Sequence, residues 1–339
     1  MTVQPVVGAP AGARAHDVAA VTAVQALERL DELVVRGEVL ARTWATGLQP
    51  LDTHLGGGLH DGDLALLAGP QGTGKTTVSL QVARNVVVAG GHATYVCFEH
   101  TPAQLVERLI VMEMALATGD LAPLQDEIRT RLARGSTDLV TALSDLPGAL
   151  QALRTIDGYG SRLRFVGARG DLTSLDDIGR VAAAAPAGLL VVDYLQKVHA
   201  GADLTEDVQV ARAATYLKHL ALELGSPVLA ISAVERAGLD APRVRARHVK
   251  GSVTLAYEAD VILVLQDKYD VVDRRHLVFG SPHGQDHRRW LVCSVEKNRH
   301  GEDRLDIEFR KRLAHGHVQP VGRLVDDALV DERMTPGHA

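Results

Sequence analysis

The chain has 339 residues, of which 46% are hydrophobic, 23% charged and 4% aromatic, and its formal net charge is -6. This negative balance excludes a uniformly basic nucleic-acid binder, although a local basic channel stays compatible with it. No apolar run approaches the roughly 18 residues of a membrane-spanning helix, and the N-terminus lacks the pattern of a signal peptide. The two cysteines, Cys97 and Cys293, lie in apolar runs, so we expect buried thiols in a cytoplasmic protein rather than a disulfide.

The two ends of the chain differ from its middle. Residues 1–16 are rich in Ala, Gly and Pro and are expected to be disordered. Asp17 is a candidate N-cap for a helix that ends near Arg36, with Gly37 as its stop. One face of this helix would carry an apolar stripe of Ala20, Ala23, Val24, Leu27, Leu30 and Val34. We therefore expect a disordered segment 1–16, a helical linker segment 17–45, a core domain 46–322 and a flexible acidic tail 323–339.

Short β-rich runs alternate with helical stretches through the core domain. The β-rich runs are LALLA (64–68), TYVCF (94–98), RLRFV (162–166), GLLVVD (188–193), PVLAIS (227–232), DVILVL (260–265) and WLVCSV (290–295). Helical patterns occupy residues 76–88, 101–117 and 206–224. Because apolar strands that alternate with helices form parallel sheets covered on both faces, the pattern predicts an α/β fold. The alternating run DRLDIEFRK (303–311) predicts a C-terminal β-ribbon at the edge of the sheet.

A glycine-rich stretch, AGPQGTGKTT (68–77), follows the first of these strands and fits the template G-x-x-x-x-G-K-[ST] at every fixed position. In this loop, backbone N–H groups and the N-terminus of the next helix face the phosphates of a nucleotide. Lys75 would reach the β- and γ-phosphates, and Thr76 would bind Mg²⁺. The expected ATP-binding residues are Gly69, Pro70, Gln71, Gly72, Thr73, Gly74, Lys75, Thr76 and Thr77.

Two acidic residues follow β-rich runs. Asp193 ends the run 188–193, where P-loop NTPases carry the carboxylate of their Mg²⁺ site. Glu99 comes directly after the run 94–98, which we expect to be a neighbour of the P-loop strand. Ligands of open α/β sheets bind at the carboxyl ends of the strands. From the residues alone, Glu99 is either the group that activates water or an acid at the start of the next helix.

The segment PRVRARHVKGS (242–252) concentrates positive charge. Such a cluster can follow a single-stranded backbone, or it can be a solvated basic loop, because no aromatic residue is interleaved for stacking on bases. The candidate DNA-binding residues are Arg243, Arg245, Arg247 and Lys250. His283 and His287 have i,i+4 spacing, but they lack Cys or Glu partners, so we expect no metal site there.

Residues 46–322 resemble the ATPase domain of the DnaB-type hexameric helicases. The opening TGLQPLDTHLGGGLHDGDLALLAG, the segment FEHTPAQLVERLI and the strand LLVVDYLQKV are similar to that family's motifs, and ISAVERAG, EADVILVLQDKY and VEKNRHG follow in the family's order. The resemblance implies a RecA-like P-loop fold with a mostly parallel sheet, ATP as substrate and Mg²⁺ as cofactor. It further implies that Glu99 polarises the attacking water.

The resemblance also implies partners. In this family the Lys and Arg of a K-x-R pattern, here Lys297 and Arg299 in VEKNRHG, reach the γ-phosphate held by the neighbouring subunit. Without the resemblance, the same residues would be a solvated basic turn. We therefore expect an ATP-hydrolysing, DNA helicase-like motor that works as a homo-oligomeric ring, usually a hexamer, on single-stranded DNA in replication or recombination. The family's N-terminal domain has no counterpart in the sequence, so contacts with primase or loader are not expected. Helix 17–36 stands where the family's linker helix docks on the adjacent subunit, so either it serves that oligomerising role or its stripe packs on the chain's own core.

Two positions depart from the family. Ala233 stands where a glutamine usually relays the γ-phosphate state to the DNA loops, and Lys250-Gly251-Ser252-Val253 replaces Arg-Glu-Ser-Gly. These changes keep a second function open, a non-helicase oligomeric ATPase that serves as a switch or scaffold. The RadA-type recombination helicases share the K-N-R-x-G pattern, but their zinc element and protease-like domain have no counterpart in the chain.

Overall fold

The computed structural model describes residues 20–37, 42–168, 173–202, 204–272 and 286–330. The chain divides into two compact units, residues 1–42 and 43–339, and each is described by itself. In the described ranges, no helix combines the length and the apolarity that crossing a bilayer requires.

The first unit contains helix α1, Ala23–Val35. The helix begins later than expected, because Thr22 and Gln25 form a reciprocal capping box at its start. The expected cap Asp17 lies outside the described residues. Arg36 is the C-cap, and Gly37 follows with a φ of 65°, so the expected stop is confirmed. A single amphipathic helix cannot bury its own apolar stripe, so the stripe of α1 has no core within this unit.

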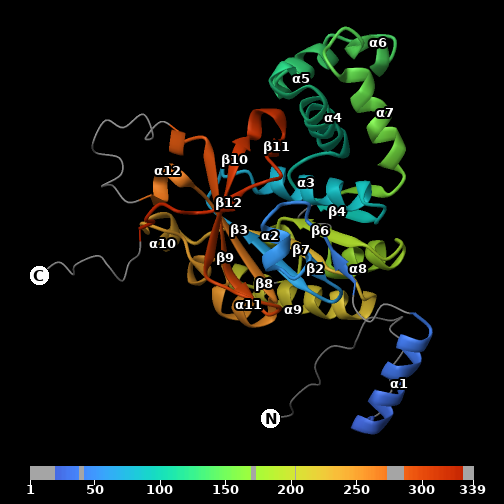
Figure 1. Ribbon diagram of the computed structural model, residues 1–339, viewed down its shortest axis with the longest axis vertical. Helices are drawn as coiled ribbons and strands as arrows, with labels where there is room; N and C mark the ends of the chain where they lie inside the picture. Colours follow the sequence, from blue (N-terminus) through green and yellow to red (C-terminus); the bar gives the residue numbers. More distant parts are fainter. Residues whose placement is uncertain (1–19, 38–41, 169–172, 203, 273–285, 331–339) are drawn as a thin grey trace, which may run out of the picture. The chain divides into compact units, whose positions relative to one another are not determined.

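The second unit is built on a sheet that runs β11-β10-β9-β8-β3-β7-β6-β4-β5, with β12 also paired to β10 (Figure 1). The strands are β3 Leu64–Ala68, β4 Ala93–Cys97, β5 Leu163–Gly167, β6 Leu189–Asp193, β7 Val228–Ser232, β8 Val261–Asp267, β9 Trp290–Asn298, β10 Leu305–Arg312, β11 His317–Val318 and β12 Arg323–Leu324, and a separate pair joins β1 Thr43–Trp44 to β2 Leu59–His60. Strands β8, β3, β7, β6, β4 and β5 are parallel, whereas β9, β10 and β11 are antiparallel. Every strand expected from the sequence is present, and the predicted α/β fold is confirmed.

Two details of the sheet differ from expectation. Strand β4 is not a neighbour of the P-loop strand β3, because β7 and β6 lie between them. The run 303–311 forms β10, which is not an edge strand, since the short strands β11 and β12 pair with it. Strand order depends on crossovers between distant segments, so the local patterns could not reveal either detail.

Helices cover both faces of the sheet. They are α2 Leu51–His54, α3 Lys75–Val88, α4 Pro102–Thr118, α5 Gln125–Ala133, α6 Leu139–Leu143, α7 Ala149–Gly160, α8 Leu175–Ala183, α9 Glu206–Leu224, α10 Arg236–Leu239, α11 Ser252–Glu258 and α12 Lys268–Val271. Side chains of β3 alternate between the two cores, because successive residues of a strand point to opposite faces. Ala65 and Leu67 pack with α3 and α4, whereas Leu64, Leu66 and Ala68 pack with α8, α9 and α11.

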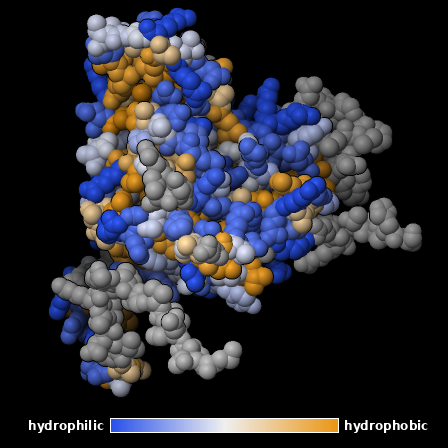
Figure 2. All heavy atoms as spheres, turned by 180° about the vertical axis from the view of Figure 1, so that it is seen from behind, coloured by the Kyte–Doolittle hydropathy of each residue, from blue (hydrophilic) through white to orange (hydrophobic). Residues whose placement is uncertain are grey.

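Helices α4 to α7 project beyond the sheet and surround a small core of their own (Figure 1). Seen from behind, exposed apolar side chains leave orange areas on this helical insertion (Figure 2). The insertion is tied to the P-loop helix α3 by a buried network. Arg84 donates two hydrogen bonds of 2.7 Å to Glu113, and the Tyr159 hydroxyl donates to the same carboxylate at 2.9 Å. A fully partnered buried network of this kind fixes the relative position of its helices.

Candidate active site

The P-loop connects the carboxyl end of β3 to the first residue of α3. Its turn requires glycine at two points. At Gly69 φ is 151°, and a Cβ would lie 2.3 Å from the Leu265 carbonyl oxygen, which no side chain could tolerate. Gly74 has a φ of 89° and is the N-cap of α3. The free N–H groups at the start of α3 therefore face the loop, as phosphate binding requires.

A cavity of about 600 Å³ lies against this loop. Every expected ATP-binding residue lines it except Thr73, whose hydroxyl donates to the Pro70 carbonyl at 2.9 Å and stabilises the turn. Lys75 Nζ donates to the carbonyl oxygens of Gly69 and Pro70, both at 2.8 Å. Burial lowers the pKa of Lys75, although Asp193 and Glu99 oppose this shift. The ammonium thus lies in the loop, close to where the phosphates of a nucleotide would bind.

Asp193 ends β6, is 1% exposed, and lines the same cavity. Its Oδ2 accepts a hydrogen bond of 2.9 Å from the Thr76 hydroxyl and another of 2.9 Å from the Tyr95 hydroxyl. Burial raises the pKa of Asp193, and these two hydrogen bonds oppose the increase. Hydroxyl and carboxylate oxygens are the ligands that Mg²⁺ takes in proteins, so Thr76 and Asp193 fit the expected metal site.

Tyr95 was not expected at the site. It lies on β4 and is buried, and its hydroxyl contacts both Asp193 and Ser79, the latter at 2.8 Å. The sequence carried a weak signal for it, since alternation in the run 94–98 places Tyr95 on one face of the strand together with Cys97. Which acid that face would meet depends on the pairing of β4 with β6, where Cys97 lies beside Asp193.

Glu99 is exposed and lines the same cavity as the P-loop residues. It lies two residues beyond the carboxyl end of β4, and the N-cap of α4 is Thr101, which forms a capping box with Gln104. Glu99 therefore is not the N-cap of this helix. Its carboxylate can reach a water molecule in the cavity.

Arg108 of α4 also lines the cavity and was missed from the sequence. Its Nη2 lies 3.0 Å from His100 Nε2, and its buried Nε has no hydrogen-bond partner among the described residues. Burial, followed by the nearby charge of Arg108, lowers the pKa of His100. A cation on a helix surface gives no sequence signal that distinguishes it from a solvated residue.

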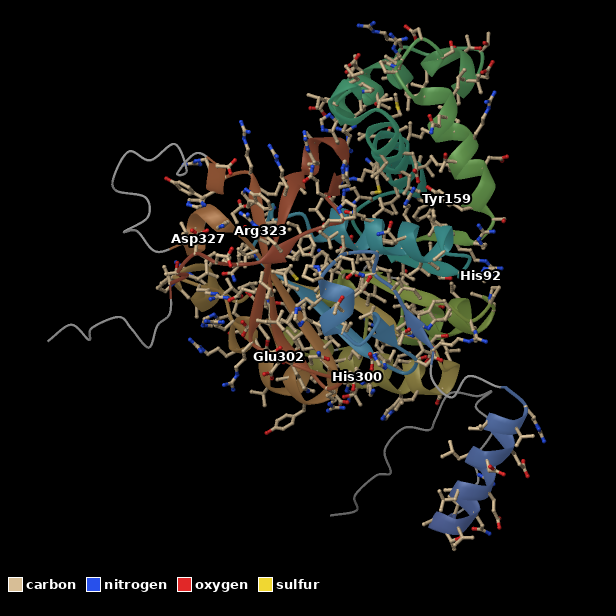
Figure 3. The ribbon with its side chains drawn as sticks, in the orientation of Figure 1. His92, Tyr159, His300, Glu302, Arg323 and Asp327 are labelled. Atoms are coloured by element: carbon tan, nitrogen blue, oxygen red, sulfur yellow. The ribbon has the colours of Figure 1, made fainter. Side chains whose placement is uncertain are left out.

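Lys297 and Arg299 lie at the other end of the parallel strands, where β3 and β8 begin. Lys297 pairs with Ile262 near the start of β8, and the Arg299 backbone N–H donates to the Asp260 carbonyl at 3.0 Å. Asp260 in turn donates its N–H to Leu64, the first residue of β3. The P-loop leaves the other end of β3, and a five-residue strand spans roughly 13–17 Å. His300 and Glu302, which follow Arg299, lie a little below the centre of the view in Figure 3.

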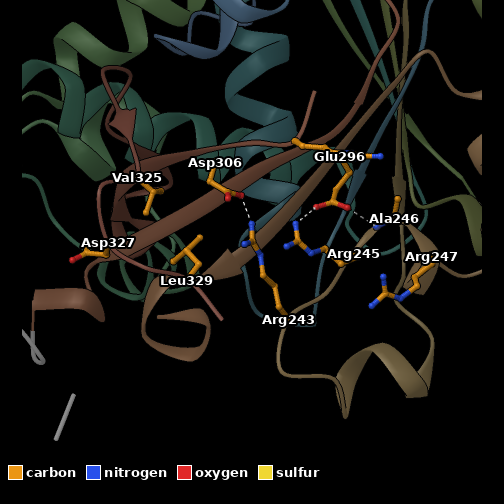
Figure 4. Close-up of a pocket in the computed structure, with 10 residues that line it drawn as sticks. Arg243, Arg245, Ala246, Arg247, Glu296, Asp306, Val325, Asp327 and Leu329 are labelled. Carbon is orange, nitrogen blue, oxygen red and sulfur yellow. Dashed lines mark hydrogen bonds and ion pairs between the residues drawn. The ribbon is translucent and has the colours of Figure 1, made fainter. Parts of the chain in front are cut away.

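Carboxylates contact the basic candidates Arg243, Arg245 and Lys250. Figure 4 shows the contacts of Arg243 and Arg245. Arg243 is 4% exposed and donates to Asp306 and Ser294. Arg245 pairs with Glu296 at 3.0 Å, and Lys250 pairs with Glu206 at 2.6 Å. Arg243, Arg245 and Arg247 line a cavity of about 590 Å³ that is separate from the P-loop cavity.

The cysteines and the histidine pair complete the sequence candidates. Cys97 and Cys293 are both free and buried, as expected, and burial raises the pKa of Cys293 to about 12. His287 is buried, and His283 lies outside the described residues. Within the described ranges, no group of three or more His, Cys, Asp or Glu could hold a metal ion.

Comparisons with known proteins agree with this geometry. A family model described as AAA domain matches residues 29–238, which is more than half of the chain, and a model described as DnaB-like helicase C terminal domain matches residues 165–315. The chain therefore belongs to the AAA-domain family, as a DnaB-like ATPase domain of RecA-like fold.

Particular relatives are similar over shorter stretches. The DNA repair protein RadA of Mycolicibacterium smegmatis is 31% identical over 159 residues, covering 47% of this chain and 34% of that protein. The replicative DNA helicase DnaB of Synechocystis sp. is 27% identical over 182 residues, covering 53% of this chain and 19% of that protein. The chain thus spans about a third or less of these curated relatives. A solved structure of a DnaB-like replicative helicase has the same fold, with a TM-score of 0.65 and 18% identity over 88% of this chain and 67% of that one.

Proposed function

We propose that the chain binds ATP at its P-loop, hydrolyses it at an interface with a second copy of itself, and acts on single-stranded DNA as a ring oligomer, with a hexamer as the expected size. The observation that carries this proposal is the position of Lys297 and Arg299. They lie at the start of β3 and β8, whereas the P-loop lies at the carboxyl end of β3. These two cations are too far from their own nucleotide site to serve it.

Within one subunit, the cavity residues have separate roles. Lys75 and the N–H groups of the loop hold the phosphates. Thr76 and Asp193 would hold Mg²⁺, which supplies positive charge for the β- and γ-phosphate oxygens. Glu99 accepts a hydrogen bond from the water and orients it toward the γ-phosphate. Tyr95 keeps the Asp193 carboxylate directed at Thr76, because both hydroxyls bind the same carboxylate oxygen.

The neighbouring subunit supplies the remaining positive charge. In a ring, a head-to-tail interface brings one edge of a subunit against a different surface of the next one. Lys297 and Arg299 of one subunit would then reach the γ-phosphate bound by the next. An arginine supplied in this way accelerates phosphoryl transfer by about 10³–10⁵-fold. Hydrolysis would therefore require assembly.

DNA binding is proposed for the segment 242–252, which is connected to the nucleotide cavity. Ala233 and Val234 line that cavity at the end of β7. The Lys250 N–H donates to the Ala233 carbonyl at 3.0 Å, and Val234 pairs with Val249. A movement of the cavity edge on hydrolysis would move the Lys250 backbone directly. This connection offers a coupling route that does not need the side chain that the family has at position 233.

A switch or scaffold without helicase activity is the second candidate. Two observations favour it. Ala233 has no polar group that could contact a γ-phosphate, and the side chains of Arg243, Arg245 and Lys250 are paired with Asp306, Glu296 and Glu206. Such a protein would keep the ring and the ATPase but would not respond to DNA.

The ATPase rate with and without single-stranded DNA distinguishes the two functions. A motor should hydrolyse ATP faster with DNA and should separate a forked duplex, whereas a switch should do neither. Lys75→Ala is the control for contaminating ATPase. Hydrolysis that no length or sequence of single-stranded DNA changes would contradict the motor.

The roles of the α1 segment, the cellular location and the pathway are proposed from the resemblance to the DnaB-type helicases. We propose that the α1 segment, residues 17–45, docks on the adjacent subunit, and that the protein works in the cytoplasm in DNA replication or recombination. The free, buried cysteines support a reducing compartment. Limited proteolysis that removes residues 1–42 should weaken ring assembly without changing nucleotide binding by the core.

A further inference from the structure

Asp260 is a buried carboxylate at the start of β8, 3% exposed, and neither the sequence motifs nor the hydrolytic steps above assign it a role. Its Oδ1 accepts a hydrogen bond of 2.8 Å from Arg299 Nη1. Its Oδ2 accepts from Lys218 Nζ at 2.7 Å and from the Leu64 N–H at 2.8 Å. We propose that Asp260 is a positioning residue, which holds Arg299 in the orientation needed to reach the nucleotide of the neighbouring subunit. This inference rests on the proposed function.

The carboxylate is held from two sides other than Arg299. Lys218 lies on α9 and also donates to the Gly62 carbonyl at 2.8 Å, so its ammonium cannot follow a moving partner. The Leu64 N–H belongs to the first residue of β3, in the middle of the sheet. Asp260 is therefore a rigid acceptor, linked directly to the strand that carries the P-loop at its other end.

Burial does not immobilise the side chain of Arg299, which is 48% exposed. Two contacts restrict it, the bond to Asp260 and a bond of 2.8 Å from Nη2 to the Tyr257 carbonyl. A guanidinium has five N–H donors, so donors remain for an anion on the neighbouring subunit. Ordering the side chain in advance lowers the entropy lost when it meets the phosphate.

The same region also holds Lys297. Its Nζ donates to the carbonyl oxygens of Ala256 and Ala259, at the C-terminal end of α11. Burial, followed by the charge of Arg299, lowers the pKa of Lys297. The two cations thus repel each other, and the negative charge of Asp260 opposes this repulsion. Asp260 is the carboxylate that Arg299 contacts here, and together with the Tyr257 carbonyl it sets the direction of the guanidinium.

The test replaces Asp260 by Asn in the full chain, which keeps the size of the side chain and removes its charge. We expect kcat for ATP to fall by roughly tenfold to a hundredfold, as for a misplaced catalytic group, with KM unchanged, because the P-loop cavity of the same subunit is intact. The effect should not add to that of Arg299→Ala, so the double variant should have the kcat of Arg299→Ala. Mixing Asp260→Asn with Lys75→Ala should restore activity, since the second subunit offers an intact Asp260 and Arg299.

Asp52→Asn is the matched control, because Asp52 is also 3% exposed and accepts hydrogen bonds from Thr46 but contacts neither cation. If Asp260→Asn does not assemble, Lys218→Met serves instead. It loosens Asp260 without changing it, and it should lower kcat less and still be rescued by Lys75→Ala.

The outcomes distinguish the positioning role of Asp260 from the use of Arg299 at a site shared between subunits. Wild-type kcat in assembled Asp260→Asn or Lys218→Met, or a loss that adds fully to Arg299→Ala, would overturn the positioning role. Full turnover in Arg299→Ala would instead remove the shared site of the proposed function.

Discussion

Two hydroxyl groups donate to one oxygen of Asp193, a carboxylate that is almost completely buried. Burial disfavours its ionised form, so the pKa of Asp193 lies above its ordinary value of 3.8. The proposed Mg²⁺ site would need the ionised form, so the group that lowers folding stability here is one that the metal would neutralise. The ionised carboxylate of Asp193 thus lowers the folding stability of the protein and is the form that the proposed metal site requires.

The Asp193→Asn variant tests whether the carboxylate lowers folding stability and supports Mg²⁺ binding. Because the raised pKa favours the protonated form in the folded protein, the wild-type carboxyl loses stability as pH rises from about 3.8 through its folded-state pKa. The Asn variant does not titrate, so its thermal midpoint without nucleotide should exceed that of wild type at neutral pH, and the gain should shrink toward pH 3.8. The Mg²⁺ concentration for half-maximal ATPase should rise by roughly 10–100-fold. A gain that grows at low pH would contradict this account.

Lys75→Ala and Glu99→Gln separate binding from hydrolysis in the same cavity. Lys75→Ala should lose nucleotide binding, because it removes the ammonium that the loop holds at the phosphate position. Glu99→Gln should bind ATP with unchanged affinity and hydrolyse it about 10²–10⁴-fold more slowly, as expected when a general base is lost. A fluorescent ATP analogue measures binding, and phosphate release measures turnover. Normal turnover in Glu99→Gln would assign water activation to another group.

At the scale of elements, α11 connects the two proposed contact regions. Lys250 precedes its N-terminal end, and the carbonyls of Ala256 and Tyr257, at its C-terminal end, bind Lys297 and Arg299. The helix has seven residues, so these regions are separated by about 10 Å at a rise of about 1.5 Å per residue. If DNA binds at Lys250 as proposed, a shift of this residue would reach the cations of the proposed subunit interface through one short helix.

Neutralising Arg245 and Lys250 together tests the DNA surface. Single-strand affinity should fall with the logarithm of salt concentration, with a slope of about -0.7 for each neutralised phosphate. The Arg245→Gln, Lys250→Gln variant should have a flatter slope and weaker binding to all sequences, because backbone contacts carry no sequence information. Arg180→Gln, on the exposed face of α8, is the matched control and should leave the slope unchanged.

Glu206→Gln should act in the opposite direction. In the structure Glu206 holds Lys250 at 2.6 Å, so this carboxylate competes with a phosphate for the same ammonium. Removing its charge should strengthen binding by a few-fold, since exposed ion pairs are worth up to about 1 kcal/mol. Fluorescence anisotropy with a labelled oligonucleotide measures both variants. Weaker binding by Glu206→Gln would mean that Lys250 does not contact DNA.

At the scale of the whole molecule, the decisive feature is the distance across the sheet between the P-loop and Arg299. This distance implies that Arg299 serves the nucleotide of a neighbouring subunit, and mixing Arg299→Ala with Lys75→Ala tests that implication. Each variant alone should be inactive, but in a mixed ring some interfaces pair an intact P-loop with an intact Arg299. With equal and random mixing, about a quarter of the interfaces are of this kind, so activity should approach about a quarter of wild type. Mass spectrometry of the rings confirms mixing, and an inactive mixed ring would exclude a shared site.

The sequence by itself determined the strand runs, the P-loop and the positions of Asp193 and Glu99 along the chain. Each of these signals resides in a few contiguous residues, because hydrophobic alternation and glycine-rich turns are local properties of a chain. The start of α1 was predicted too early, since Asp17 and Thr22 are both good caps and only the capping box with Gln25 selects the second.

Only the tertiary structure decided which distant residues meet. Strand order separates β4 from β3 and places β6 beside β4, which brings Tyr95 to Asp193. The same sheet buries Arg243 against Asp306 and seats Arg299 on Asp260, although the local sequence describes both arginines only as basic. Contacts between segments far apart in the chain depend on sheet pairing and helix crossovers, and a run of neighbouring residues carries no information about either.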